Sequence, residues 1–379
     1  MRASRLWLVV TSVLLAACAS PAQPSASSEA SVAAALTPSP APSTGAPAPS
    51  GAPTAGMIAY AAGIEDPQIF LLDLETGESR QLTHLGPNDA QLTGEGPLRP
   101  ALSCGFGAYW LAWSPDGSQL AFTYGSCDTV VFTVDLAGEV RRIGDGRTPA
   151  WSPDGSRLIY GANIPYMPCV GCQDPGAPGE LELRVMDVAG GGEPGPFTAD
   201  GSTSSAGMPS YSPDGTTIAY SGPADGGGAE TFGATYLIGA DGSGARLLAN
   251  GGYPAGWLRD GRLLISRESD SSVHAIDIES GESEQVGAAQ TTSVAPDGTR
   301  SLEWTIDPVT GAQALQLRTS DGELLGETTG SFGTWAPDSG AFAVFGDDGG
   351  LHLVSRDGEL LTSYDIAAAG GVAAWRPGS

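Results

Sequence analysis

Lysine is absent from this chain, so arginine supplies all 17 of its basic side chains. With 43 Asp and Glu residues the formal net charge is −26. A surface this acidic repels phosphate backbones, which argues against nucleic-acid binding. Histidine is also scarce, and His84, His274 and His352 are far apart in the sequence. This spacing argues against a clustered, histidine-based metal site.

The chain also lacks the short motifs that mark common catalytic sites. It contains no S-x-x-K, G-x-S-x-G, H-E-x-x-H, Walker A or EF-hand sequence. We therefore expect a protein that is not an enzyme and that uses no cofactor and no metal. An active site assembled from distant parts of the chain stays open as an alternative.

The N-terminus carries the features of an export signal. Arg2 and Arg5 precede an apolar stretch, LWLVVTSVLLAA, which is short for a membrane span. It ends in LAAC, and this ending resembles the lipobox of bacterial lipoproteins. The resemblance implies removal of residues 1–17, acylation of Cys18 and a lipid anchor on the extracytoplasmic face of an envelope membrane. An ordinary secretory signal followed by a chance cysteine is the alternative.

Residues 18–55 form a segment of different composition. After Cys18 it consists almost entirely of Ala, Pro, Ser, Thr and Gly, with Glu29 as its one charge. Such a composition cannot build a core, so it predicts a disordered tether. The folded domain is then expected over residues 56–379.

A five-residue turn sequence recurs throughout this domain. Its copies are WSPDG at Trp113, WSPDG at Trp151, YSPDG at Tyr211, WLRDG at Trp257, VAPDG at Val294, WAPDS at Trp335 and WRPGS at Trp375. Pro pre-sets φ and Gly tolerates positive φ, so the pattern predicts a tight hairpin. The leading aromatic residue is expected at a strand end, packed between neighbouring sheets.

The turns are separated by strand-like segments. Apolar runs such as LAFTY (120–124) follow the turns, and a further strand ending in an Asp/Gly/Glu turn comes next, as in VVFTVDLAGE (130–139). Repeats of about 40–45 residues with this order are typical of β-propeller blades. The fold class predicted is all-β, a seven-bladed β-propeller of four-stranded blades. The C-terminal strand, within 371–378, is expected to join the N-terminal blade and close the ring.

The repeat W-S-P-D-G, I-A-F/Y and I-x-x-x-D-x-x-x-G-E resembles the repeat of TolB-like propellers, over about residues 56–379. The resemblance implies the fold. Its implications for function are broad, because such propellers include partner-binding periplasmic proteins, domains that gate prolyl-oligopeptidase-type hydrolases, and some polysaccharide lyases.

One rim of the predicted propeller is expected to carry the binding surface. The turn repeats fall on one rim, whereas the long segments 85–107, 161–181, 197–209 and 221–233 fall on the other, in or beside blades two to four. Binding residues often lie on irregular loops above a rigid scaffold. The candidate residues near these segments are Phe106, Tyr109, Trp110 and Tyr166. Core packing of Tyr109 and Trp110 and neutral drift in loop length are the alternatives.

The other cysteines belong to the same part of the chain. We expect disulfides Cys104–Cys127 and Cys169–Cys172, because an extracytoplasmic compartment permits them and each pair belongs to a single blade. A four-cysteine metal site is the rival arrangement.

The combined expectation is a monomeric, membrane-anchored binding or scaffolding lipoprotein that takes an envelope protein or peptide as partner. Binding of a glycan or the cell wall is one alternative, and a propeller enzyme such as a polysaccharide lyase is another.

Overall fold

The computed structural model describes the chain in segments. These are residues 56–63, 68–86, 107–125, 129–162, 182–188, 191–198, 206–224, 232–267, 270, 272–288, 291–306, 313–330, 332–346, 348–366 and 372–377. The chain divides into two compact units, Met1–Ala46 and Pro47–Ser379, and every described residue belongs to the second. The expected signal peptide, Cys18 and the whole of the expected tether lie outside the described residues.

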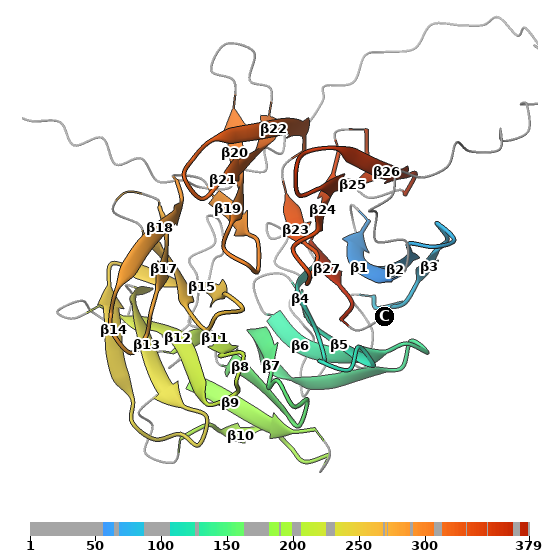
Figure 1. The fold of residues 1–379 in the computed structure, drawn as a ribbon. Helices are drawn as coiled ribbons and strands as arrows, with labels where there is room; N and C mark the ends of the chain where they lie inside the picture. The colour runs from blue at the N-terminus through green and yellow to red at the C-terminus, as the bar shows by residue number, and fades with distance from the viewer. Residues whose placement is uncertain are drawn as a thin grey trace, which may run out of the picture. The chain divides into compact units, whose positions relative to one another are not determined.

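The described strands form seven antiparallel blades arranged around a common centre (Figure 1). Five of them are separate four-stranded sheets, and the other two are joined through one long strand, β7 (Val140–Trp151). The first half of β7 pairs with β6 (Thr129–Asp135), and its second half pairs with β8 (Arg157–Ala162). β7 is therefore the outermost strand of blade two and the innermost strand of blade three.

The strands occupy equivalent places in the blades. Besides the second half of β7, the innermost strands are β27 (Ala373–Trp375), β4 (Gly107–Trp113), β11 (Gly207–Tyr211), β15 (Gly252–Trp257), β19 (Thr291–Val294) and β23 (Gly333–Trp335). Besides β8, the second strands are β1 (Met57–Ala62), β5 (Gln119–Gly125), β12 (Thr217–Pro223), β16 (Leu263–Arg267), β20 (Arg300–Ile306) and β24 (Ala341–Phe345). The expected four-stranded repeat is confirmed.

The outer half of each blade is built in the same way. Besides β6, the third strands are β2 (Gln68–Asp73), β9 (Glu182–Asp187), β13 (Phe232–Gly239), β17 (Val273–Ile276), β21 (Gln313–Thr319) and β25 (Leu351–Ser355). Besides the first half of β7, the outermost strands are β3 (Ser79–Gln81), β10 (Gly195–Pro196), β14 (Arg246–Asn250), β18 (Ser283–Gly287), β22 (Leu324–Thr329) and β26 (Leu360–Tyr364). Blade three has the shortest outermost strand, with two residues in β10.

The repeated turn is held together by its own side chains. In the copy at Trp151, Ser152 Oγ donates to the Asp154 carboxylate at 2.6 Å, and the backbone N–H of Ser156 donates to the same oxygen at 2.9 Å. These hydrogen bonds lower the pKa of Asp154 to about 2, because they stabilise the ionised form. Gly155 completes the turn at φ 71°, where a side chain would be strained.

The two kinds of turn lie on one rim, as the sequence predicts. The N–H of Val188, just after β9, donates to the carbonyl of Ser156 in the repeated turn of the same blade. Ala240 and Thr216 form the equivalent bond in blade four. The first-to-second and third-to-fourth strand turns are therefore neighbours, and the opposite rim carries the remaining connections.

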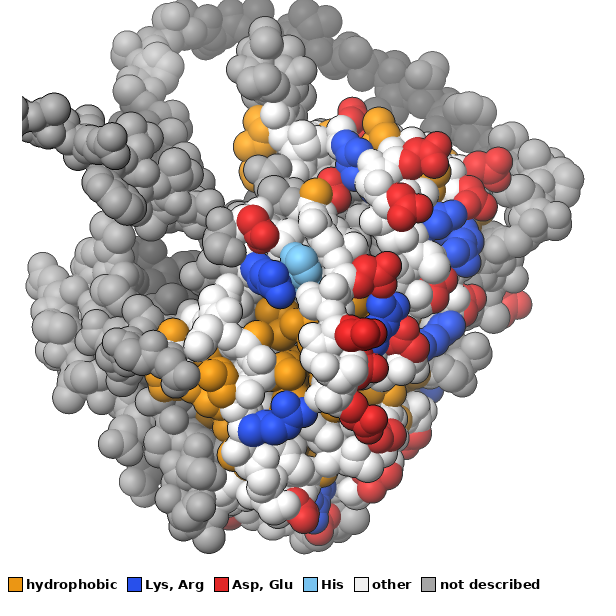
Figure 2. Space-filling view, turned by 60° about the vertical axis from the view of Figure 1, so that its left-hand side comes forward, with side chains coloured by type: hydrophobic (Ala, Val, Ile, Leu, Met, Phe, Trp, Pro, Cys, Tyr) orange, Lys and Arg blue, Asp and Glu red, His pale blue; other side chains and the backbone are white. Residues whose placement is uncertain are grey.

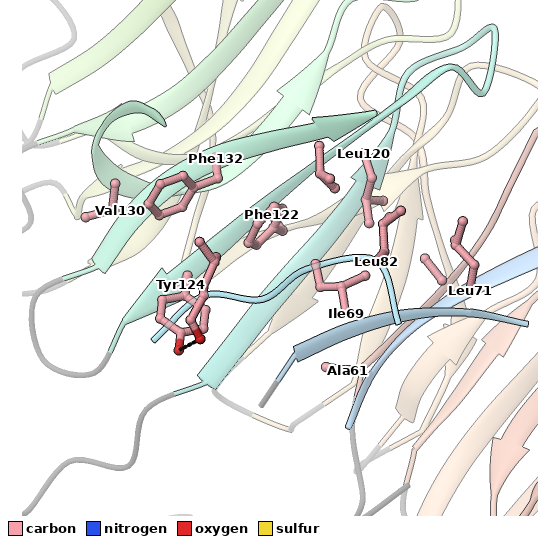
Figure 3. Packing of buried hydrophobic residues seen from close by; sticks show 12 residues of the cluster. Ala61, Ile69, Leu71, Leu82, Leu120, Phe122, Tyr124, Val130 and Phe132 are labelled. Atoms are coloured by element: carbon pink, nitrogen blue, oxygen red, sulfur yellow. Dashed lines mark hydrogen bonds between the residues drawn. The ribbon is translucent and has the colours of Figure 1, made fainter. Parts of the chain in front are cut away.

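Apolar side chains fill the junctions between neighbouring blades. Figure 3 shows the junction of blades one and two, where Ile69 and Leu71 face Leu120 and Phe122. The rings of Phe122 and Phe132 stack with their centroids 5.6 Å apart. Similar clusters fill the other junctions among the described residues. The core is therefore distributed around the ring, and each blade is stabilised mainly by its two neighbours.

At four of the repeated turns the leading tryptophan also links adjacent innermost strands. The indole N–H of Trp151 donates to the Ala112 carbonyl of blade two at 2.9 Å. Four tryptophans form this bond to the preceding blade, and the others are Trp113, Trp257 and Trp375. The expected packing role is confirmed, and the polar end of the indole adds a directional contact.

The ring closes where the expected strands meet. β27 pairs with β1, with Trp375 opposite Ile58 and Ala373 opposite Tyr60 (Figure 1). The Arg376 N–H donates to the Met57 carbonyl at 2.9 Å. Residues from the two ends of the domain thus complete blade one, which removes the free edge of β1.

Candidate binding site on the loop-bearing rim

The rim opposite the repeated turns, here called the loop-bearing rim, joins second to third strands and one blade to the next. Four of its connections include long stretches outside the described residues, at 87–106, 163–181, 199–205 and 225–231. All four join strands within or beside blades two to four, as expected from the sequence. The site is therefore built from the strand ends that these segments leave and enter.

The structure places only some of the candidate residues. Phe106, Tyr166 and the four cysteines Cys104, Cys127, Cys169 and Cys172 lie outside the described residues, so both disulfides stay predictions. Tyr109 and Trp110 belong to β4, the innermost strand of blade two. Trp110 is 45% exposed, so it is not a core residue.

Three matched β-bulges distinguish the innermost strands of these blades. In blade two, two residues of β4 between Tyr109 and Ala112 lie opposite the single residue Phe122 of β5. Blade three repeats this geometry between Arg147 and Ala150, opposite Tyr160.

Blade four carries the third bulge, between Gly207 and Ser210, opposite Tyr220. Among the described residues, the bulges of β15 and β19 in blades five and six have different registers. The two-against-one bulge therefore belongs to blades two to four, the same blades that the long connections join.

Each of the three bulges holds a non-glycine residue at positive φ. The values are 48° for Trp110, 53° for Thr148 and 49° for Met208. Bulky and β-branched residues avoid this region, at a cost of about 1–3 kcal/mol each. Such strain persists where the surrounding structure enforces it, and it concentrates at binding and active sites. Sequence reasoning missed these bulges. Pro149 and Pro209 follow the strained residue in blades three and four, but Leu111 takes that place in blade two, so no single residue pattern marks all three.

The fourth non-glycine residue at positive φ has a different origin. Ser339, at φ 63°, occupies the position in WAPDS that glycine holds in WSPDG. Its φ belongs to the repeated turn on the opposite rim and therefore does not mark the candidate site.

Two histidines take part in side-chain hydrogen-bond networks that contain the same residue types as the Ser-His-Asp triad of hydrolases. His352 Nδ1 lies 2.7 Å from Ser363 Oγ, and its Nε2 lies 3.1 Å from the Asp348 carboxylate. Blade five has His274 at the equivalent place, 3.2 Å from Ser283 Oγ. The arrangement recurs in two blades, and in each it links the third strand to the turn before it and to the outermost strand.

The third histidine and the acidic residues form no metal site in the described chain. His84 is exposed and lies three residues beyond the end of β3. Within the described ranges, no group of three or more His, Cys, Asp or Glu side chains is placed to hold a metal ion. The described residues also contain no helix of the length and apolarity that crossing a bilayer requires.

Some of the acidic side chains on the surface pair with arginines. In Figure 2, acidic side chains alternate with arginines along one side of the viewed face. One such group is Arg262, which contacts Asp260 at 2.8 Å and Glu284 at 2.6 Å. The acidity is thus distributed among turns and strand ends.

Comparison with solved structures agrees with the fold. No family model matches the chain, and no curated protein matches it in sequence. An oligogalacturonate lyase in complex with manganese is 19% identical with a TM-score of 0.50, over 76% of this chain and 83% of that one. TolB from Acinetobacter baumannii is 16% identical with a TM-score of 0.45, over 85% and 67% of the two chains.

A third similar structure is prolyl oligopeptidase B from Galerina marginata, bound to a 35mer hydrolysis and macrocyclization substrate. It is 10% identical with a TM-score of 0.52, and 82% of this chain matches half of its length. At such identities the likeness shows the fold alone, and this fold occurs in enzymes and in other proteins.

Proposed function

We propose that this protein is a non-catalytic binding lipoprotein, anchored by Cys18 outside the cytoplasm, that binds an envelope protein or peptide on the loop-bearing rim of blades two to four. The observation that carries the proposal is the set of three matched bulges, each with a strained residue, on consecutive innermost strands. A scaffold that needed only stability would not retain three such costs in neighbouring blades.

Trp110 is the expected anchor of this interface. Its indole combines a large apolar area with a hydrogen-bond donor, and tryptophan is enriched among the residues that dominate binding energy. Its side chain is 45% exposed at a bulge that fixes the backbone. A rigid, accessible aromatic residue loses little conformational entropy when a partner covers it.

Replacing Trp110 should weaken partner binding without unfolding the domain. For Trp110→Ala we expect a loss of at least about 2 kcal/mol, or roughly thirtyfold in Kd. The measurement is affinity capture from envelope extract with the full chain, followed by titration of the captured partner. Leu360→Ala is the matched control, because Leu360 is 61% exposed on β26 of blade seven.

A second arm of the same experiment shortens the segments 163–181 and 225–231. Loss of the partner in this variant and in Trp110→Ala would support the proposal. If both variants keep the partner, the loop-bearing rim is not the binding surface.

Replacing Cys18 should release the protein from the membrane. A chain with Cys18→Ser cannot be acylated on sulfur, and two or three acyl chains are what give durable anchoring. We expect the parent protein in the membrane fraction and the variant in the soluble fraction, measured by fractionation and by mass spectrometry of the N-terminal peptide. An unacylated parent would contradict the lipoprotein assignment.

A further inference from the structure

Arg147 differs from the other arginines of the described chain. Most of these hold a carboxylate or a backbone carbonyl through the guanidinium group, as Arg318 does with Glu303 at 3.0 Å and Arg157 with the Ala240 carbonyl at 3.2 Å. Arg259 is an exposed turn residue in the field of Asp297. The guanidinium of Arg147 forms no ion pair and no hydrogen bond with any described residue.

This unpaired cation is also partly buried. Burial alone lowers the pKa of Arg147, with no contribution from a neighbouring carboxylate. A guanidinium stays protonated under all ordinary conditions, so the side chain keeps its charge in this environment. A desolvated charge without a partner costs free energy. In a chain with a net charge of −26, acidic side chains are abundant, yet none of those that the structure describes pairs with Arg147.

The position of Arg147 connects it to the proposed binding surface. It is the last paired residue before the bulge of β7, and the next residue is the strained Thr148. Its register partner is Gly161, so the two residues share one face of the sheet. That face lies against blade four, because a Cβ on Gly161 would be 3.4 Å from the Cα of Gly207.

The surrounding backbone is held firmly. The Thr148 hydroxyl donates to the Arg147 carbonyl at 2.8 Å, and Thr148 itself is 8% exposed. Across the junction, Ser221 Oγ donates to the Gly207 carbonyl at 3.0 Å. The backbone that carries the guanidinium is therefore preorganised, which reduces the entropic cost of binding an anion.

We propose that Arg147 binds a carboxylate of the partner, supplied by an acidic residue or by the free C-terminus of a peptide segment on the loop-bearing rim. A guanidinium pairs with a carboxylate through two parallel N–H···O bonds, and such pairs are strongest away from water. The inference rests on the proposed function and specifies the chemistry of its ligand. A peptide is favoured over an acidic glycan because Met208 and the exposed Trp110 occupy the neighbouring bulges.

The test uses the full chain and a library of displayed linear peptides with free C-termini. Peptides selected on the parent protein should be enriched in Asp or Glu, or should need a free C-terminal carboxylate for binding. This selection is expected even though the acidic surface of the protein repels negatively charged peptides in general. Their affinity should fall at least about tenfold for Arg147→Gln, since a hydrogen bond to a charged group contributes more than 1.4 kcal/mol. Arg157→Gln, in β8 of the same blade near the opposite rim, should bind as the parent does.

The other outcomes are distinguishable. If the selected peptides show no enrichment in acidic residues, or if Arg147→Gln binds them as the parent does, the assignment of Arg147 is overturned. The proposed function is tested separately through Trp110. Binding of an oligouronate probe that depends on Arg147, with no peptide selected, would overturn the peptide source. Failure of both probes to bind would overturn the proposal.

A stability measurement separates binding from a structural role. Because the Arg147 guanidinium has no partner to lose, Arg147→Met should have a Tm equal to or above that of the parent. Arg318→Gln, which breaks the pair with the buried Glu303, should have a lower Tm. A marked drop in Tm for Arg147→Met would show that Arg147 stabilises the fold, and it would overturn the proposal.

Discussion

Ending the chain after Gly370 is expected to destabilise the propeller by about 5 kcal/mol or more, which is comparable to the whole stability of many domains. The truncation removes β27, the innermost strand of blade one, and leaves β1 as an open edge. It also removes Trp375, whose indole donates to the Thr334 carbonyl of blade seven at 3.0 Å.

Further contacts across the closure are lost in the same truncation. The Arg376 side chain donates to the Gly117 carbonyl at 2.7 Å, and the Trp113 indole donates to the Ala374 carbonyl at 3.1 Å. Blade one therefore loses contacts to both of its neighbours. We expect a chain that is largely unfolded or aggregated, because an open, apolar strand edge pairs with other chains.

Circular dichroism melts and size-exclusion chromatography measure this effect. A chain ending at Pro377 is the matched control, because it keeps β27 and should melt at the parent Tm. A cooperative transition near the parent Tm in the shorter chain would show that ring closure contributes little to stability.

The second large effect is expected at Trp151, which links blades two and three. Trp151 is 9% exposed and belongs to the cluster that joins Ala121 and Val131 of blade two to blade three. Trp151→Ala should cost about 3–5 kcal/mol, since it removes a large buried side chain and leaves a cavity. Urea denaturation gives this value directly from the midpoint and the m-value.

A milder pair of variants isolates the indole hydrogen bond. Trp151→Phe keeps an aromatic ring but leaves the Ala112 carbonyl without its donor. Trp335 is 6% exposed, and its buried indole N–H has no hydrogen-bond partner, so Trp335→Phe loses no such bond. Trp151→Phe should therefore be more destabilising by about 1–2 kcal/mol. Equal losses at the two sites would mean that packing alone accounts for the role of these tryptophans.

The contrast between these two tryptophans shows where sequence reasoning stops. Both precede the same turn sequence, so both are expected at blade junctions, and both are found there. Of the two, only Trp151 donates its indole N–H to a carbonyl of the preceding blade among the described residues. For Trp335 the preceding innermost strand, β19, ends in Val294 in place of an aromatic residue. The neighbouring blade thus determines whether the tryptophan of the same turn motif forms an inter-blade hydrogen bond.

The candidate site also has features that the sequence predicts and features that only the structure shows. The unequal lengths of the connections, and their placement beside blades two to four, follow from the spacing of the turns along the chain. The bulges do not, because Trp110, Thr148 and Met208 are residues of three different types and only the last two precede a proline. Their shared geometry arises where two residues of an innermost strand face one buried aromatic residue of the second strand. That relation exists only once the strands are in register.

The sequence alone determined the all-β class, the seven repeats, the strand order within a blade, the rim of the repeated turns and the strand that closes the ring. It could do so because turn chemistry and strand alternation are local properties that recur at each repeat. Only the tertiary structure decided which indoles bond to the preceding blade, where the inner strands bulge, and that Arg147 is partly buried with no counter-charge among the described residues. These features depend on register and burial across neighbouring strands and blades, which no local pattern encodes.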